Sequence, residues 1–365
     1  MEYRIITCYQ FNKIDFEPDL IIGFYQDINQ CEFQKHYKKI QDMYPNANVI
    51  GCSSESNIYD EVPHVDVDEK HICIYLFLKL NKNGYKIKLL DSNQHIDLQD
   101  DGKKYDAIIL SSNYSDFLED NIEYLNKQLG IKHLYGGIAG ISNISNDATI
   151  FYNGDVYTNT LLLLLLDNDY YKLDGLSIHQ FEPVGFELTI TKSKDNIIYE
   201  LDNQPALKVL ENIIGHLTHK KIRTFSFPFF LKTDDYKSFE ESPLCSIKGI
   251  NRDTNSISVY RYVKNNDKVK LSIPVSSYEQ LKRLRKFHKL RKSNSVAFVF
   301  NCLGVKAYLG MMEYLYLMDL KRHLNIPFIG FHSFGEIGPF ENGGVSIIHN
   351  QTISLAILSA VGEEA

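Results

Sequence analysis

The chain has no excess of positive charge and no apolar run of membrane-spanning length, and both absences limit its function. Its 365 residues include 39 Lys and Arg against 46 Asp and Glu, a formal net charge of −7. This balance argues against nucleic acid as the main partner. The most apolar run, residues 161–166, is six leucines, far short of the roughly 20 residues that cross a bilayer. We expect no membrane insertion and interpret the run as a strand buried on both faces.

The chain also lacks the sequence signs of export and of paired cysteines. Its first eight residues do not have the charged-then-apolar layout of a signal peptide. The six cysteines are scattered without C-x-x-C spacing. We therefore expect reduced thiols and a cytoplasmic location.

Familiar catalytic and cofactor motifs are absent as well. The segment 51–55, Gly-Cys-Ser-Ser-Glu, lacks the second glycine of a serine nucleophile elbow, and no glycine-rich phosphate loop is present. His216 and His219 have no nearby carboxylate, so we predict no metal site and no cofactor. A cysteine nucleophile, Cys52 or Cys302, needs a histidine that only the fold could supply. The sequence thus favours binding over a reaction, and whether the protein is an enzyme stays open.

We expect three apolar strands, each after a helix-like stretch, to stop at a glycine turn that carries small polar residues. They lie at residues 49–54, 134–140 and 328–336. Such strand ends usually meet at the rim where an α/β protein binds small ligands. Asn153-Gly154 is typical of a hairpin turn. We predict an α/β fold of two mixed β-sheets with flanking helices, built from repeated strand–helix–strand–hairpin units.

Several short motifs resemble, in order and spacing, those of FIST-domain proteins, a family of presumed intracellular sensors. They are Ile-Gly-Cys-Ser-Ser at 50–54, Gly-Gly-Ile-Ala-Gly at 136–140, Gln-Pro-Ala-Leu at 204–207, Asn-Cys-Leu-Gly at 301–304, Gly-Phe-His-Ser-Phe-Gly-Glu-Ile at 330–337 and His-Asn-Gln-Thr at 349–352. The resemblance implies an N-terminal FIST domain, which we place at 1–225, and a C-terminal one at 226–365. One departure is Val305, which stands where the family commonly has Arg.

The resemblance implies a cytoplasmic sensor that binds an amino acid or a related small zwitterion and signals through a separate protein partner. We expect Glu336 to receive an ammonium group, with the glycine N–H groups and the serines holding a carboxylate. The expected ligand-binding residues are Cys52, Ser53, Ser54, Gly137, Ala139, Asn301, Cys302, His332, Ser333, Glu336 and Asn350.

Two alternatives to a sensor remain open. One is an enzyme that uses Cys52 or Cys302 in acyl or thiol chemistry. The other is a module that recruits a protein partner, for which the basic block at residues 282–292 offers a surface. On a helix the apolar residues of that block share one face, so we expect its charges to point to solvent.

Overall fold

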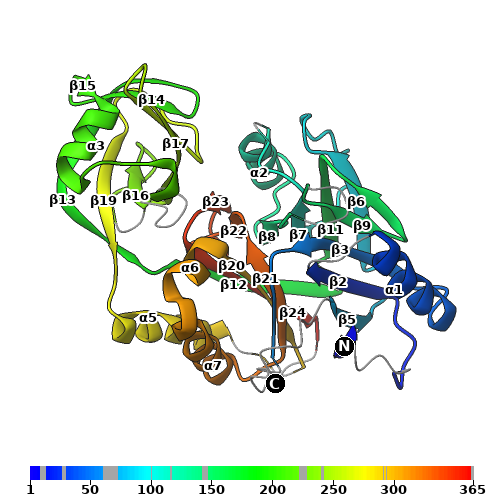
Figure 1. The fold of residues 1–365 in the computed structure, drawn as a ribbon. Coiled ribbons are helices and arrows are strands. Elements are labelled where there is room, and N and C mark those ends of the chain that lie inside the picture. Colours follow the sequence, from blue (N-terminus) through cyan, green and yellow to red (C-terminus); the bar gives the residue numbers. More distant parts are fainter. Residues whose placement is uncertain are drawn as a thin grey trace.

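The computed structural model describes residues 1–8, 14–26, 30–60, 73–99, 101–115, 117–141, 147–221, 228–239, 242–290, 292 and 294–362. The chain has the expected mixed α/β character (Figure 1). Its described strands form four sheets, which corrects the expected two. The number of sheets is higher because three separate strand–helix–strand segments each form a sheet of their own. A fourth set of strands closes into a barrel.

Three sheets surround the centre of the molecule. Sheet 1 consists, in spatial order, of β1 (Glu2–Thr7), β5 (Cys73–Lys79), β2 (Leu20–Gln26), β3 (Asn48–Ser54), β9 (Ile150–Tyr152) and β10 (Asp155–Tyr157). Sheet 2 consists of β23 (Ile347–His349), β22 (Glu336–Gly338), β8 (Leu134–Ile138), β7 (Tyr105–Ser111), β11 (Thr160–Asp167) and β6 (Tyr85–Asp91). Sheet 3 consists of β12 (Tyr171–His179), β24 (Thr352–Ala360), β20 (Val296–Cys302), β21 (Phe328–Ser333) and β4 (Asn57–Tyr59).

Each of these sheets contains one parallel strand pair joined through helix. The pairs are β2–β3 through α1 (Gln30–Met43), β7–β8 through α2 (Leu118–Lys127), and β20–β21 through α6 (Leu303–Leu309), η3 (Gly310–Met312) and α7 (Glu313–Leu324). A Cβ added at Gly51, Gly136 or Gly330 would lie 1.7–1.8 Å from a carbonyl oxygen of the parallel neighbour. The strands continue past these glycines, so the expected stop at each glycine is wrong. The complete strand–helix–strand–hairpin repeat stays a prediction.

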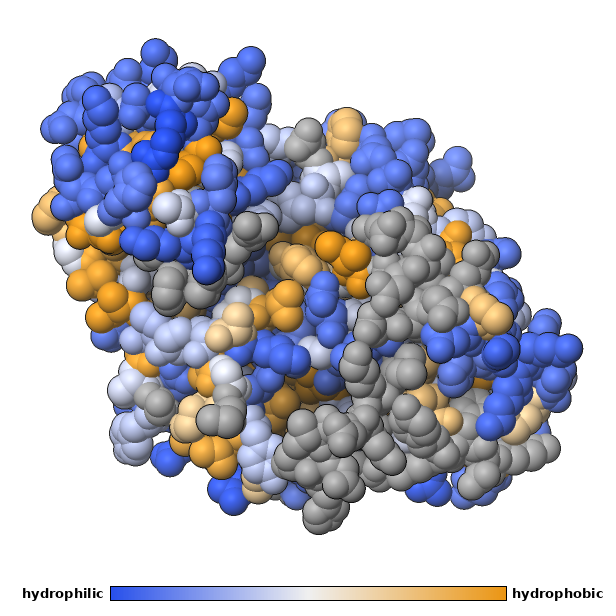
Figure 2. Space-filling model, viewed as in Figure 1, coloured by the Kyte–Doolittle hydropathy of each residue, from blue (hydrophilic) through white to orange (hydrophobic). Residues whose placement is uncertain are grey.

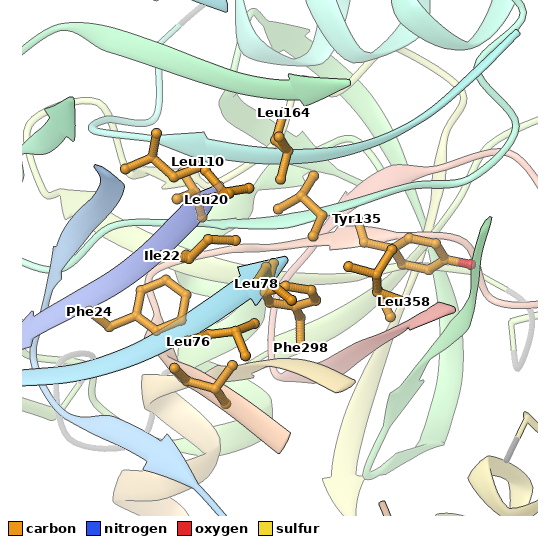
Figure 3. Close-up of a cluster of buried hydrophobic side chains, with 14 of the residues drawn as sticks. Leu20, Ile22, Phe24, Leu76, Leu78, Leu110, Tyr135, Leu164, Phe298 and Leu358 are labelled. Atoms are coloured by element: carbon orange, nitrogen blue, oxygen red, sulfur yellow. The ribbon is translucent and has the colours of Figure 1, made fainter. Parts of the chain in front are cut away.

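One apolar core fills the space between the three sheets. Figure 3 shows side chains from all three converging, among them Ile22 of sheet 1, Leu164 of sheet 2 and Phe298 of sheet 3. The outer faces are covered by α1 on sheet 1, α2 on sheet 2, and α5 (Ser277–Leu284) with α7 on sheet 3. The leucine-rich β11 is buried along its whole length, as expected for a strand covered on both faces.

The fourth sheet forms a closed barrel beside this body. Its order is β13 (Phe181–Lys194), β19 (Lys268–Pro274), β16 (Pro228–Lys232), β17 (Leu244–Asn251), β18 (Ser256–Val259), β14 (Ile197–Leu201) and β15 (Gln204–Pro205), and β13 also pairs with β14. Helix α3 (Ala206–Ile214) packs its apolar face into the same core. The long strands β13 and β19 run between this lobe, at the upper left of Figure 1, and the rest of the molecule.

The two halves of the chain share sheets. Strand β4 pairs with β21, β12 pairs with β24, and β8 pairs with β22. Each pair joins a strand from before residue 180 to one from after residue 325. The predicted boundary at residues 225 and 226 lies outside the described residues, and the division into 1–225 and 226–365 stays a prediction.

Candidate functional site

All eleven residues expected to bind ligand are buried. They come from β3, β8, β20, β21, β22 and the segments that follow β8 and β23. The tertiary structure thus brings both halves of the chain to one region. Within it, three local arrangements can be distinguished.

The first arrangement surrounds Glu336, which is completely buried. The Ser333 hydroxyl donates to one carboxyl oxygen at 2.6 Å, and the Thr352 N–H donates to the other at 3.3 Å. Gly137 lies opposite Glu336 in the antiparallel pair β8–β22. Burial raises the pKa of Glu336 well above its usual range. The carboxyl group therefore tends to hold a proton. Its hydrogen bonds in the folded protein are made to Ser333 and Thr352.

The two cysteines of interest are poorly suited to nucleophilic chemistry here. Cys302 keeps 7% of its surface exposed, and burial, followed by the charge of Glu336, raises the pKa of its thiol far above the usual value. Cys52 is fully buried in the central core, and burial also raises its pKa. A thiol in such surroundings stays protonated near neutral pH, while the reactive form is the thiolate.

The second arrangement ties sheets 1 and 2 together. The Ser53 hydroxyl donates to the Gly140 carbonyl at 2.5 Å and accepts from the Thr149 N–H at 2.8 Å. The Ser54 hydroxyl donates to the Asn57 side-chain oxygen at 2.6 Å. Ala139 packs in the same core cluster as Cys52. These contacts account for the small polar residues after the first of the three glycines, Gly51.

The third arrangement surrounds His332 on the opposite face of β21 from Ser333. Its imidazole contacts the Ser56 hydroxyl, at 2.6 Å, and the Glu313 carboxylate. Asn301 lies beside His332 in the parallel pair β20–β21 and is fully buried. The sequence pattern did not identify Ser56 or Glu313, because they are far from His332 along the chain. Asn350, apart from this group, accepts from the Ser246 N–H at 3.2 Å.

A large cleft lies between the barrel lobe and the body of the molecule, with a volume of about 970 Å³. One wall comes from the barrel lobe, including Tyr236 and Arg261. The other comes from α2, including Glu119, and from the segment 340–348. Figure 2 shows the surface hollowed between these two parts, with apolar side chains beside the hollow. None of the eleven expected residues lines this cleft, and no pattern in the single sequence pointed to it.

Arg261 is one of several charged groups in the wall of the cleft. Its side chain is 14% exposed, and one of its terminal N–H groups donates to the Ile348 carbonyl. Its Nε lies 3.9 Å from a carboxyl oxygen of Glu119, beyond hydrogen-bond distance, and has no hydrogen-bond partner in the described structure. The same Glu119 oxygen accepts from the Tyr114 hydroxyl at 2.8 Å. An arginine held in this way can accept an anionic group from a ligand.

The basic block borders the same cleft. Its residues 282–290 form the end of α5 and the 3-10 helix η2 (Arg285–Leu290), and the apolar residues Leu284 and Phe287 pack against sheet 3. Arg283 does not point only to solvent as expected, because it donates to the carbonyls of His179 and Phe181 at 3.0 Å each. Arg291, the last arginine of the block, lies outside the described residues.

No group of three or more His, Cys, Asp or Glu side chains is placed to hold a metal ion in the part of the chain described above. Within the same residues, no helix is both long and apolar enough to cross a membrane.

Comparison with known proteins places the chain in a family. The model of the FIST N domain matches residues 19–204, and the model of the FIST C domain matches residues 206–339. A search of curated proteins found no significant match. Since the first model alone covers about half of the chain and the second follows it directly, the protein belongs to the FIST family, whose domains are associated with sensing in signal transduction.

Proposed function

We propose that this protein is a sensor that binds an amino acid or a related small zwitterion in the cleft between the barrel lobe and the body. The observation that carries the proposal is the cleft itself, with Arg261 in its wall. Its volume of about 970 Å³ is in the range of ligand-binding pockets, which often lie between two structural units. The family association with sensing supports a binding role rather than a structural one.

The charges in the walls suit a ligand that carries both signs. The guanidinium of Arg261 can take a carboxylate through two parallel N–H donors. The carboxylates of Glu119 on α2 and of Glu341 on the segment after β22 line the cleft and can take an ammonium group. Apolar side chains such as Ile122 and Phe340 line the remaining walls, where a ligand side chain can pack.

One of the buried residues expected from the sequence, Glu336, is one strand away from the lining of this cleft. Ile348 lines it, and the next residue, His349, pairs with Glu336 across β22–β23. A ligand that moves β23 would therefore act on the Glu336 arrangement. In this proposal Glu336 responds to the ligand through the strand pair, and direct ligand contact by the eleven expected residues stays a prediction.

The proposed signal is a change in the position of the barrel lobe. The lobe joins the body along β13 and β19, whose pairing is interrupted between Val184 and Leu188. A ligand held by both walls favours the closed arrangement in proportion to its extra contacts there. A cytoplasmic protein partner would read that arrangement, and the exposed basic residues of α5 and η2 are a candidate surface for it.

A thermal-shift screen of the twenty amino acids and their simple derivatives tests the proposal. A ligand present at 100 times its dissociation constant stabilises the folded state by about 2.7 kcal/mol, so a true ligand should raise the melting temperature with concentration. Compounds that lack either the carboxylate or the ammonium group are the matched controls. If no zwitterion in the panel stabilises the protein at millimolar concentration, the proposal is wrong.

A further inference from the structure

Four polar side chains from three distant segments form one hydrogen-bonded chain at the edge of sheet 3. The Lys306 ammonium of α6 donates to the Ser56 hydroxyl at 2.6 Å. That hydroxyl lies 2.6 Å from Nδ1 of His332, at the end of β21. The Nε2 atom of His332 contacts the carboxylate of Glu313, the first residue of α7.

With a neutral His332 imidazole, the donors in this chain set its direction. The Lys306 ammonium can only donate, so Ser56 Oγ accepts from it and has its own hydrogen left to give. The hydrogen is directed to Nδ1 of His332, whose Nε2–H then donates to Glu313. A hydroxyl bonded to an imidazole that is oriented by a carboxylate is the arrangement that activates a serine. Here the ring is turned so that Nδ1, rather than Nε2, faces the serine.

We propose that Ser56 is a nucleophile for carboxylic esters, with His332 as its general base and Glu313 as the residue that positions the imidazole. The positive charge of Lys306 stabilises the oxyanion that forms when a carbonyl is attacked. This activity is independent of the ligand cleft, since none of the four residues lines it. It also does not use the cysteines that the sequence offered as nucleophiles.

Two further observations distinguish this cluster from a simple tie between strands. Asn301, in register with His332 and on the same face of sheet 3, is fully buried, and neither polar atom of its side chain has a hydrogen-bond partner in the described structure. A buried amide without partners is costly, which is usual where a ligand group completes the bonding. The cluster is also not sealed, because Ser56 keeps 8% of its surface exposed and the Glu313 side chain 14%.

The surroundings indicate an ester with an apolar part. The helical segment that carries Lys306 and Glu313 also exposes large apolar side chains to solvent. They are Tyr308 at 53%, Met312 at 47%, Tyr314 at 43% and Leu315 at 49%. Exposed apolar groups gathered on one segment commonly mark a binding surface.

The reaction proceeds in two steps, acylation of Ser56 and hydrolysis of the acyl group. Ser56 Oγ forms a bond to the carbonyl carbon while its proton moves to His332 Nδ1. The carbon–oxygen bond to the alcohol breaks, and the alcohol leaves with that proton, which gives acyl-Ser56. Water then attacks the acyl group with its proton going to His332, and release of the carboxylic acid returns the proton to Ser56.

A fluorophosphonate probe with an alkyl chain tests the proposal on the full-length protein. Attack by Ser56 forms an oxygen–phosphorus bond and releases fluoride, and intact mass followed by peptide mapping locates the adduct. The variants are Ser56→Ala, His332→Gln and Glu313→Gln. The matched control is Ser115→Ala, because Ser115 keeps the same 8% of its surface exposed but donates to the Ser92 carbonyl and not to an imidazole.

We expect one adduct per chain at Ser56, absent in Ser56→Ala and formed about 100-fold more slowly in His332→Gln. Ser115→Ala should react at the wild-type rate, and circular dichroism should show that each variant is folded. The rates at which the variants hydrolyse p-nitrophenyl esters should rank in the same order as their rates of adduct formation. Absence of an adduct in the folded wild-type protein, or labelling that persists in Ser56→Ala, overturns the proposal.

Discussion

Glu336 lies directly opposite Gly137 in the antiparallel pair β22–β8, although 199 residues separate them along the chain. A strand from the region matched by the FIST C model thereby extends a sheet built from the region matched by the FIST N model. The carboxyl group becomes buried because this pairing carries it into the space between sheets 2 and 3. The pH dependence of stability follows from that burial.

Replacing Glu336 with Gln should make stability less dependent on pH above pH 4.5. Burial raises the pKa of Glu336 in the folded state above its unfolded value, so the folded state binds the proton more tightly. Its contribution is complete below the unfolded pKa and is lost as pH rises toward the folded pKa. In thermal unfolding between pH 4 and pH 8, the melting temperature of Glu336→Gln should rise relative to that of the wild-type protein as the pH increases. Parallel curves would contradict this.

His349 should give stability the opposite dependence on pH, with a loss as the pH falls. Burial lowers its pKa to about 3, while its Nε2–H donates to the Gly338 carbonyl at 2.8 Å and Arg261 and His179 add positive charge nearby. Neutral His349 therefore makes a contribution to the free energy of unfolding that is complete above pH 6.5 and is lost as the pH falls toward 3. Between pH 6.5 and pH 4 we expect His349 to lower the free energy of unfolding by about 3 kcal/mol. Urea unfolding of His349→Gln should lack this loss, and an equal acid loss in both proteins would refute the assignment.

Substitution of Gly330 with Ala should destabilise the fold strongly. The new Cβ would lie 1.7 Å from the Val299 carbonyl oxygen of the parallel neighbour, and a backbone clash inside a sheet cannot be relieved locally. We expect a loss of about 3 kcal/mol or more in the free energy of unfolding. Gly249→Ala is the control, because its nearest contact is the Ser258 hydroxyl at 3.1 Å. Similar urea midpoints for the two variants would show that β20 and β21 can separate without cost.

The cysteines should differ sharply in their reaction with iodoacetamide at pH 7.5. Cys31 is exposed on α1 and should react within minutes. Cys302 and Cys52 should react at least about 100-fold more slowly, because burial raises their pKa and blocks access. Peptide mapping before and after unfolding in urea measures the difference. Rapid labelling of Cys302 in the folded protein would restore the cysteine-dependent enzyme as an alternative.

Arg261 should control the affinity for any zwitterion found in the screen. Arg261→Met removes the proposed carboxylate partner, and loss of a charge-assisted hydrogen bond costs about 1.5–3 kcal/mol, or roughly 10- to 100-fold in affinity. The control is Lys127→Met on α2, whose ammonium pairs with Glu123 at the same cleft. Calorimetry on both variants measures the change. Equal affinities in the wild-type protein and Arg261→Met would place the ligand elsewhere.

Much of the local structure could be predicted from the sequence because it depends on neighbouring residues. The six leucines of β11 have no polar face, so only a strand covered on both sides fits them. Asn153 and Gly154 both have positive φ, which is why that dipeptide marks the turn between β9 and β10. The order of short motifs was sufficient to identify the family, which the two domain models confirm.

What the sequence alone could not determine is which distant segments meet. Sheet pairing depends on backbone hydrogen bonds between strands that any apolar strand can make, so β4 beside β21 and β22 beside β8 leave no sign in the residue pattern. Those pairings place Ser56 against His332 and bury Glu336. The cleft around Arg261 likewise exists only because the barrel closes beside the body. The sequence by itself determined the strands and the family, while tertiary packing decided the sites, since a site requires side chains from several segments at fixed distances.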